Sequence, residues 1–107
     1  MANTFKNQGA AITTAGAIVY TAPAATQSVI HSCYISNIDG TSSADVSIKA
    51  RATSGDTYYH VAKTVPVPAD STLVLDKPID LEATGDVFMT SSATGDLEAV
   101  MGILEIT

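Results

Sequence analysis

Three turn signals of the same kind punctuate this chain, and they constrain its fold more than any other feature. Each places Gly and Asp together after a Ser or Thr, at positions 54–56, 84–86 and 94–96. The last two lie ten residues apart, the spacing of one short strand and its turn in an all-β sandwich or barrel. In such turns Asp bonds its own backbone, while Gly takes the positive φ that other residues avoid. The spacing therefore predicts short antiparallel strands.

Alternation of apolar and polar residues places strands between the turns. The clearest example is Ala44–Ala52, where Val46 and Ile48 alternate with polar residues that point to water. Residues 28–37, 57–65 and 97–106 are further strands, and the two prolines of 65–68 suit an edge. No window of eleven residues has a helical period with caps. From the alternation alone, we expect these residues in the core: Val46, Ile48, Leu73, Leu75 and Phe88.

The length and the strand pattern together predict one all-β domain. A chain of 107 residues can bury one core without crosslinks. We expect a single β-sandwich over residues 10–107, of jelly-roll or immunoglobulin-like type, with an open barrel as the alternative. Residues 1–9 are mostly polar with one aromatic residue, Phe5, and we interpret them as an N-terminal arm that docks on a neighbouring chain.

The last expected strand, 97–106, is apolar on both faces. Leu97, Met101 and Ile103 fall on one face, and Val100, Leu104 and Ile106 fall on the other. A two-layer sandwich has one inner face per sheet, so the second set needs cover from an arm or another subunit. The pattern predicts a homo-oligomer, for which a trimer is one arrangement, or a contact with another protein. The candidate interface residues are Phe5, Val100, Leu104 and Ile106.

Charge limits the class of partner. The net charge is −6, from 11 acids against 5 Lys and Arg, so the chain cannot neutralise a run of phosphates and we expect no nucleic-acid partner. From Asp76 onward there are seven acids and one base, Lys77, which marks either a face for a basic partner or a solvated acidic surface. No stretch of 18 apolar residues occurs, so we expect no membrane partner. Charged residues are only 15% of the chain, which favours a surface covered by neighbours.

Few residues suggest chemistry. His31 and Cys33 share one face of a strand under strict alternation, but no third metal ligand accompanies them, so we expect no metal and no cofactor. Cys33 is the only cysteine, which rules out an intramolecular disulfide. No nucleophile elbow and no phosphate-binding glycine loop occur, so we do not expect an enzyme. Tyr58, Tyr59 and His60 form a cluster of the kind that binds sugars, although such a cluster is more often ordinary strand packing.

Most of the chain, with its clearest pattern in the second half, resembles the small virion structural proteins of tailed bacteriophages. The pattern is V-P-x-x-x-x-L-x-L, an L-x-x-x-G-D turn and a closing L-E-I, formed here by Val67, Pro68, Leu73, Leu75, Leu81, Gly85, Asp86, Leu104, Glu105 and Ile106. Residues 35–38, followed by a Ser/Thr-rich turn, fit its first half, so the resemblance covers 28–107. It implies a non-enzymatic protein of the virion, assembled in the host cytoplasm.

Within that resemblance, the expected role is a head decoration or cement protein. Its partners would be the major capsid protein or other virion proteins, bound through protein–protein contacts. A place in the neck, the tail or a fibre base is the close alternative. A small carbohydrate-binding module that uses Tyr58, Tyr59 and His60 is the alternative from a different class.

Overall fold

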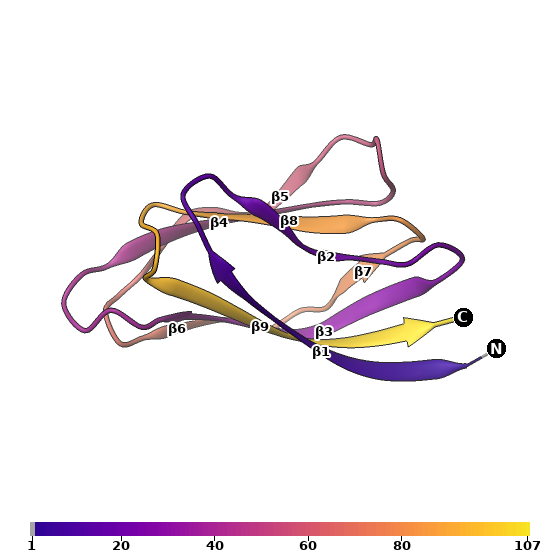
Figure 1. Cartoon of the computed structure of the whole chain (residues 1–107), viewed down its shortest axis with the longest axis horizontal. Coiled ribbons are helices and arrows are strands. Elements are labelled where there is room, and N and C mark those ends of the chain that lie inside the picture. Colours follow the sequence, from indigo (N-terminus) through magenta and orange to yellow (C-terminus); the bar gives the residue numbers. More distant parts are fainter. Residues whose placement is uncertain (1) are drawn as a thin grey trace.

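The fold is built entirely from β-strands. The computed structural model describes residues 2–107, and these residues contain nine strands and no helix (Figure 1). Among them, therefore, no helix is long and apolar enough to cross a membrane. The strands are β1 (Asn3–Ile12), β2 (Ala17–Thr21), β3 (Gln27–Asn37), β4 (Ala44–Arg51), β5 (Tyr59–Val67), β6 (Thr72–Leu75), β7 (Ile79–Leu81), β8 (Asp86–Ser91) and β9 (Leu97–Ile106).

The strands form two antiparallel sheets. Sheet A has the order β1-β9-β3-β6, and β7 also pairs with β3. Sheet B has the order β2-β8-β4-β5. The two sheets lie one over the other in Figure 1, with buried side chains of both gathered in one core. The all-β, two-sheet fold that the turn spacing predicts is therefore confirmed.

The core consists of the inward-facing residues of both sheets. Val46 and Ile48 are fully buried, as the alternation of β4 predicts. Leu73 and Leu75 are only half-buried, because β6 is a short strand at one side of sheet A, and they pack against the core from there. Phe88 was expected in the core, and this is wrong. The neighbouring residues Val87 and Met89 point inward and are buried, so Phe88 faces out of sheet B and is half-buried.

A β-bulge in β3 changes which residues of that strand face the core. Ile30 pairs with Ile103 and Ser32 pairs with Gly102, so the register with β9 shifts across His31. Before the bulge Ile30 is buried, and after it Cys33 and Ile35 are buried. Strict alternation would place His31 and Cys33 on one face, and the bulge shows that expectation to be wrong: His31 is exposed and Cys33 is in the core.

The segment expected to be an N-terminal arm lies mostly within a strand. Asn3 to Ile12 pair residue by residue with β9, from Asn3 opposite Ile106 to Ile12 opposite Leu97. The boundary expected at residue 10 therefore falls inside β1. Met1, the first residue of the expected arm, lies outside the described residues. The polar residues of this segment suit an edge strand, where most side chains meet water.

The three Gly-Asp turns use glycine in two different ways. Gly55 and Gly95 have positive φ, of 88° and 92°, as the turn interpretation predicts. At the third turn the positive φ belongs to Thr84, at 67°. Gly85 is needed there for space, because a β-carbon would stand 2.3 Å from the carbonyl oxygen of Ala52.

Candidate interaction face

The outward-facing side of sheet A carries a set of apolar side chains. Along the central strand β9, Leu97, Ala99, Met101 and Ile103 are buried in the core. The residues between them therefore point away from the core. Together with their neighbours on the adjoining strands they form a surface that we call the outer A face: Phe5, Val29, Tyr34, Val74, Val100, Leu104 and Ile106.

Strand register arranges these side chains in two rows across the sheet. In the first row Leu104 lies between Phe5 of β1 and Val29 of β3. In the second row Val100 lies opposite Tyr34, which in turn lies opposite Val74 of β6. Directly opposed residues on one face have their β-carbons about 4.5–5.5 Å apart. Each row is therefore an apolar stripe across three neighbouring strands of sheet A.

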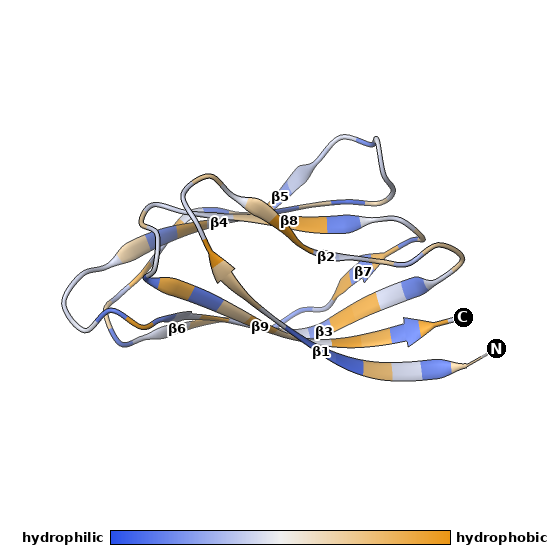
Figure 2. Cartoon of the chain, in the orientation of Figure 1, coloured by the Kyte–Doolittle hydropathy of each residue, from blue (hydrophilic) through white to orange (hydrophobic). Residues whose placement is uncertain are grey.

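These stripes are open to solvent. The exposed fractions are 77% for Phe5, 53% for Val74, 45% for Tyr34 and 44% for Val100. Figure 2 shows the apolar stretches of β3 and β9, which pair side by side at the centre of sheet A. Contiguous exposed apolar surface of this kind marks interaction sites in soluble proteins. The outer A face is therefore the strongest candidate for a functional surface among residues 2–107.

The bulge at His31 contributes to this surface. The imidazole of His31 meets the ring of Phe5 edge to face, with the ring centroids 6.3 Å apart. Cys33, two residues on, points into the core, where burial raises the pKa of its thiol to about 11. The two side chains therefore lie on opposite sides of β3 and cannot form a thiolate–imidazole pair.

All four interface residues proposed from the sequence lie on the outer A face. Phe5 is directly opposite Leu104, and Ile106 is opposite Asn3 at the end of the same strand pair. The prediction from the sequence missed Tyr34 and Val74, which stand at outward positions of β3 and β6. Their place on this face follows from strand register, which joins residues that are distant in the chain.

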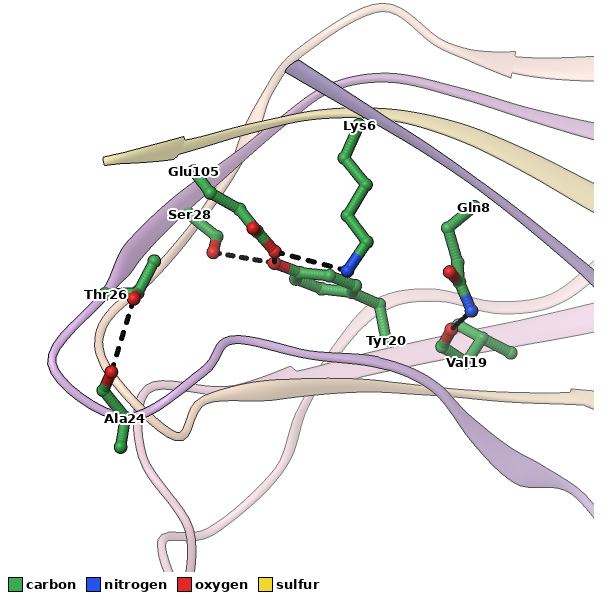
Figure 3. Close-up of polar contacts among 8 residues, drawn as sticks. All are labelled: Lys6, Gln8, Val19, Tyr20, Ala24, Thr26, Ser28 and Glu105. Atoms are coloured by element: carbon green, nitrogen blue, oxygen red, sulfur yellow. Dashed lines mark hydrogen bonds and ion pairs between the residues drawn. The ribbon is translucent and has the colours of Figure 1, made fainter. Parts of the chain in front are cut away.

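A polar network lies between the sheets at one end of the sandwich (Figure 3). The hydroxyl of Tyr20, from β2 of sheet B, donates a hydrogen bond of 2.5 Å to Oε2 of Glu105 on β9. Ser28 of β3 lies 2.8 Å from the same hydroxyl and, since the tyrosine proton is already used, donates to it. Burial, followed by the bond to Glu105, raises the pKa of Tyr20 to about 12.

The same network extends to the edge strand β1. Nζ of Lys6 lies 3.7 Å from Oε2 of Glu105, and Nε2 of Gln8 donates to the carbonyl of Val19 at 3.3 Å. The first contact holds β1 against β9, and the second holds it against β2 of the opposite sheet (Figure 3). Every member of the network has a structural partner, so we interpret it as a brace between the sheets.

A second polar cluster is centred on Asp86 of sheet B. Asp86 is buried, and its carboxylate accepts a hydrogen bond from Nε of Arg51 at 3.0 Å and another from the hydroxyl of Tyr58. The guanidinium of Arg51 lies over the Tyr58 ring at 4.5 Å, and Nζ of Lys49 lies 4.9 Å from the rings of both Tyr58 and Phe88. The outward-facing Phe88 is thus packed under the Lys49 side chain.

The aromatic cluster proposed for sugar binding is divided in the structure. Tyr58 is half-buried in the Asp86 cluster, whereas Tyr59 is 75% exposed. Tyr59 lines a cleft of about 470 Å³ together with Arg51, Asp56 and Asp80, and neither Tyr58 nor His60 is among its lining residues. The three residues therefore do not form a single platform.

Four acidic residues, Asp39, Asp56, Asp86 and Glu105, make turn contacts or ion pairs. Oδ1 of Asp39 accepts hydrogen bonds from the backbone N–H and the hydroxyl of Thr41, and these bonds lower the pKa of the Asp39 carboxyl. The turn interpretation is thus confirmed for Asp39. Within residues 2–107, no group of three or more His, Cys, Asp or Glu side chains is placed to hold a metal ion.

Comparison with known proteins gives no family for this chain. No protein-family model matches the sequence, and no curated protein matches it either.

Proposed function

We propose that this protein is a non-enzymatic structural component of a tailed-phage particle, a head decoration or cement protein. The observation that carries the proposal is the outer A face, whose apolar stripes lie over the central strands of sheet A. The apolar core of a protein–protein interface is depleted of charge and enriched in aromatic residues. Phe5 and Tyr34 supply such aromatic contacts, and Glu98 is the one ionisable residue of β9 that shares this face.

We infer further that the sandwich is a jelly roll. The orders β1-β9-β3-β6 and β2-β8-β4-β5 place the first and last strands of the chain side by side, and successive strands change sheet at every step except β4 to β5 and β6 to β7. This is the wrapped pattern of a double-sheet jelly roll, an architecture that viral capsid domains and lectins use. The fold supports the proposal only as an analogy, because one fold hosts many functions.

The proposed partners are the major capsid protein or other virion proteins, with self-association in addition. Burial of the outer A face against a capsid subunit would remove its apolar side chains from water, the main favourable contribution to such contacts. The net charge of −6 favours a partner surface that carries basic residues. A neck, tail or fibre-base position would use the same face and remains the close alternative.

A carbohydrate-binding function is the second candidate, and the Tyr59 cleft is the observation that favours it. An exposed aromatic ring beside Asp56, Asp80 and Arg51 combines a stacking surface with groups that bond hydroxyls. Saturation-transfer NMR with a panel of sugars tests this role. A signal that is lost in Tyr59→Ala and kept in Tyr58→Phe would support it, and the absence of any signal would remove it.

Immunogold electron microscopy tests the proposed function directly. Antibodies against the purified protein should label phage particles from the source culture densely and evenly over the head. Label at the neck or tail would select the alternative position. An absence of label on intact particles, with the protein found only in the unassembled fraction, would overturn the proposal.

A further inference from the structure

The four edges of the two sheets are protected to different degrees. Exposed edges can pair with strands of other chains, so proteins shorten, kink or interrupt them. Edge strand β2 has five residues and a register shift across Val19. Edge strand β5 contains Pro66 and has two register shifts. On the far side of sheet A, β6 and β7 have four and three residues, and Pro78 lies between them.

The remaining edge, β1, lacks all of these protections. It has ten residues and pairs with β9 without a register shift. Residues 2–14 contain no proline and no acid, and their one base is Lys6. Lys6 pairs with Ile103, an inward residue, so its side chain turns toward the sandwich, where it contacts Glu105. The edge is therefore long, regular and free of charge on its outward side.

The hydrogen bonds at the chain ends show which backbone groups of β1 are free. Ala2 and Thr107 exchange two backbone hydrogen bonds, of 3.3 and 2.9 Å. Along an antiparallel ladder, residue pairs that exchange two hydrogen bonds alternate with pairs that exchange none, whose backbone groups point away from the partner strand. Asn3, Phe5, Asn7, Gly9 and Ala11 therefore direct their N–H and C=O groups away from β9. No other strand of residues 2–107 pairs with β1 on that side.

We propose that β1 pairs antiparallel with β1 of a second copy of this chain, about a two-fold axis at Asn7. The two A sheets would then form one continuous sheet. In this register the residues that pair across the axis are Phe5 with Gly9 of the second copy and Asn3 with Ala11 of the second copy. All of them direct their free backbone groups toward each other.

Two features of β1 fit this self-pairing. Gly9 has open space above it, since the nearest atom to an added β-carbon would be 3.8 Å away, and Phe5 is 77% exposed. The register places each Phe5 ring over the Gly9 of the other copy, an arrangement that compensates for a missing side chain in a strand. Each copy carries a charge of −6, yet the acid-free segment 2–14 keeps like charges away from the seam.

The consequence would be one apolar surface twice as wide. The outer A faces of two copies would meet at the seam, since Phe5 belongs both to that face and to the pairing edge. This inference depends on the edge itself and not on the particle proposed above, so either can fail without the other.

Sedimentation equilibrium tests the pairing. From micromolar to millimolar concentration, the wild-type mass should rise to twice the 11.0 kDa of one chain. Asn7→Pro removes an N–H that points away from β9, and it leaves the β1–β9 ladder intact. It should weaken dimerisation about ten-fold or more. Asn7→Ala is the matched control, because it keeps the N–H and should dimerise like the wild type.

Disulfide trapping gives a second test that does not depend on how well the proline variant folds. In a Cys33→Ala background, Asn7→Cys places two thiols at the axis, where Cα atoms of a bonded pair are about 5.5 Å apart and within disulfide range. Mild oxidation should give a covalent dimer. Val61→Cys, on the edge of sheet B, is the control and should stay monomeric.

Three results would overturn the proposal. The first is a wild-type protein that stays monomeric up to millimolar concentration. Pairing of the β1 edge with a strand of a different protein would not change this conclusion. The second is a folded Asn7→Pro variant that dimerises like Asn7→Ala. The third is trapping that is no faster at Asn7→Cys than at Val61→Cys.

Discussion

Gly102 of β9 faces the bulge of β3, and a β-carbon at Gly102 would stand 2.6 Å from Cε1 of His31. It would also stand 2.7 Å from Oγ of Ser32. The bulge crowds two side chains into the outward space opposite one residue, so that residue must have none. The bulge and the glycine therefore depend on each other.

Gly102→Ala should destabilise the domain by about 1–3 kcal/mol through overpacking at this contact. His31 is exposed and can rotate away, at the loss of its contact with Phe5, which limits the cost. The control is Gly40→Ala, where the nearest atom is 3.6 Å from the added carbon. Urea unfolding measures both. The loss of unfolding free energy caused by Gly102→Ala should be smaller in a His31→Ala background than in the wild type. An equal loss in both backgrounds would contradict this explanation.

Tyr20→Phe should lower the free energy of unfolding by about 1–3 kcal/mol. The change removes the hydroxyl that hydrogen-bonds to Glu105 and Ser28, and it leaves both polar groups without that partner. Lys6→Met removes only a partly exposed ion pair with Glu105 and should cost less than about 1 kcal/mol. Denaturant melts compare the two variants. Equal costs would mean that the network does not depend on the tyrosine.

Stability should fall at alkaline pH through Tyr20. Its pKa is raised from 10.0 to about 12 in the folded protein, so the folded state holds the proton longer than the unfolded chain does. The contribution of protonated Tyr20 to the free energy of unfolding is fully present below pH 10, and it is lost as the pH rises toward 12. Thermal melts across this window should show a smaller loss for Tyr20→Phe than for Tyr59→Phe, whose ring is exposed. Identical pH profiles would refute the assignment.

Asp86→Asn should cost about 3 kcal/mol, because it leaves the Arg51 guanidinium partly buried without its counter-ion. The effect should change little with added salt, since the carboxylate is shielded from solvent. Asp56→Asn is the control: its carboxylate is exposed and bonds the Thr53 hydroxyl, so a cost under about 1 kcal/mol is expected. Urea melts at low and high salt measure both.

Val100→Ser should weaken binding to phage heads and leave the fold almost unchanged. Val100 is 44% exposed on the outer A face, and Val61, at 45%, lies on sheet B and offers a matched control. We expect the Val100→Ser/Leu104→Ser double variant to bind purified heads at least about ten-fold more weakly in co-sedimentation. Val61→Ser should bind like the wild type. Normal binding with reduced stability would assign the face to the chain's own packing.

Alternation predicts this fold well wherever strands are regular. Val46 and Ile48 are placed correctly because β4 has no bulge between itself and its neighbour β8. The prediction fails after His31, since one inserted residue exchanges the two faces of a strand and leaves no mark in the hydropathy pattern. It fails at Phe88 for a different reason. A large aromatic ring suits the core, but Val87 and Met89 take the inward positions of β8, so this ring faces outward and packs beside Lys49.

The candidate surface is only partly readable from the sequence. Val100, Leu104 and Ile106 stand out because β9 is apolar on both faces. The polar and small residues of β1 do not predict a strand. The segment is a strand because it pairs with β9 along its whole length. Tyr34 and Val74 join the surface only through register, which connects strands 40 positions apart in the chain. No local pattern can carry that information.

The pairing of Ala2 with Thr107 also determines how the domain would respond to force. A pull between the two chain ends would load the β1–β9 ladder from its open end, one hydrogen-bonded pair after another. Such peeling needs little force, because each step breaks few bonds. A load applied across the two sheets would instead oppose the whole core together with the Tyr20–Glu105 brace. The domain is therefore mechanically weak along its termini and strong through its thickness.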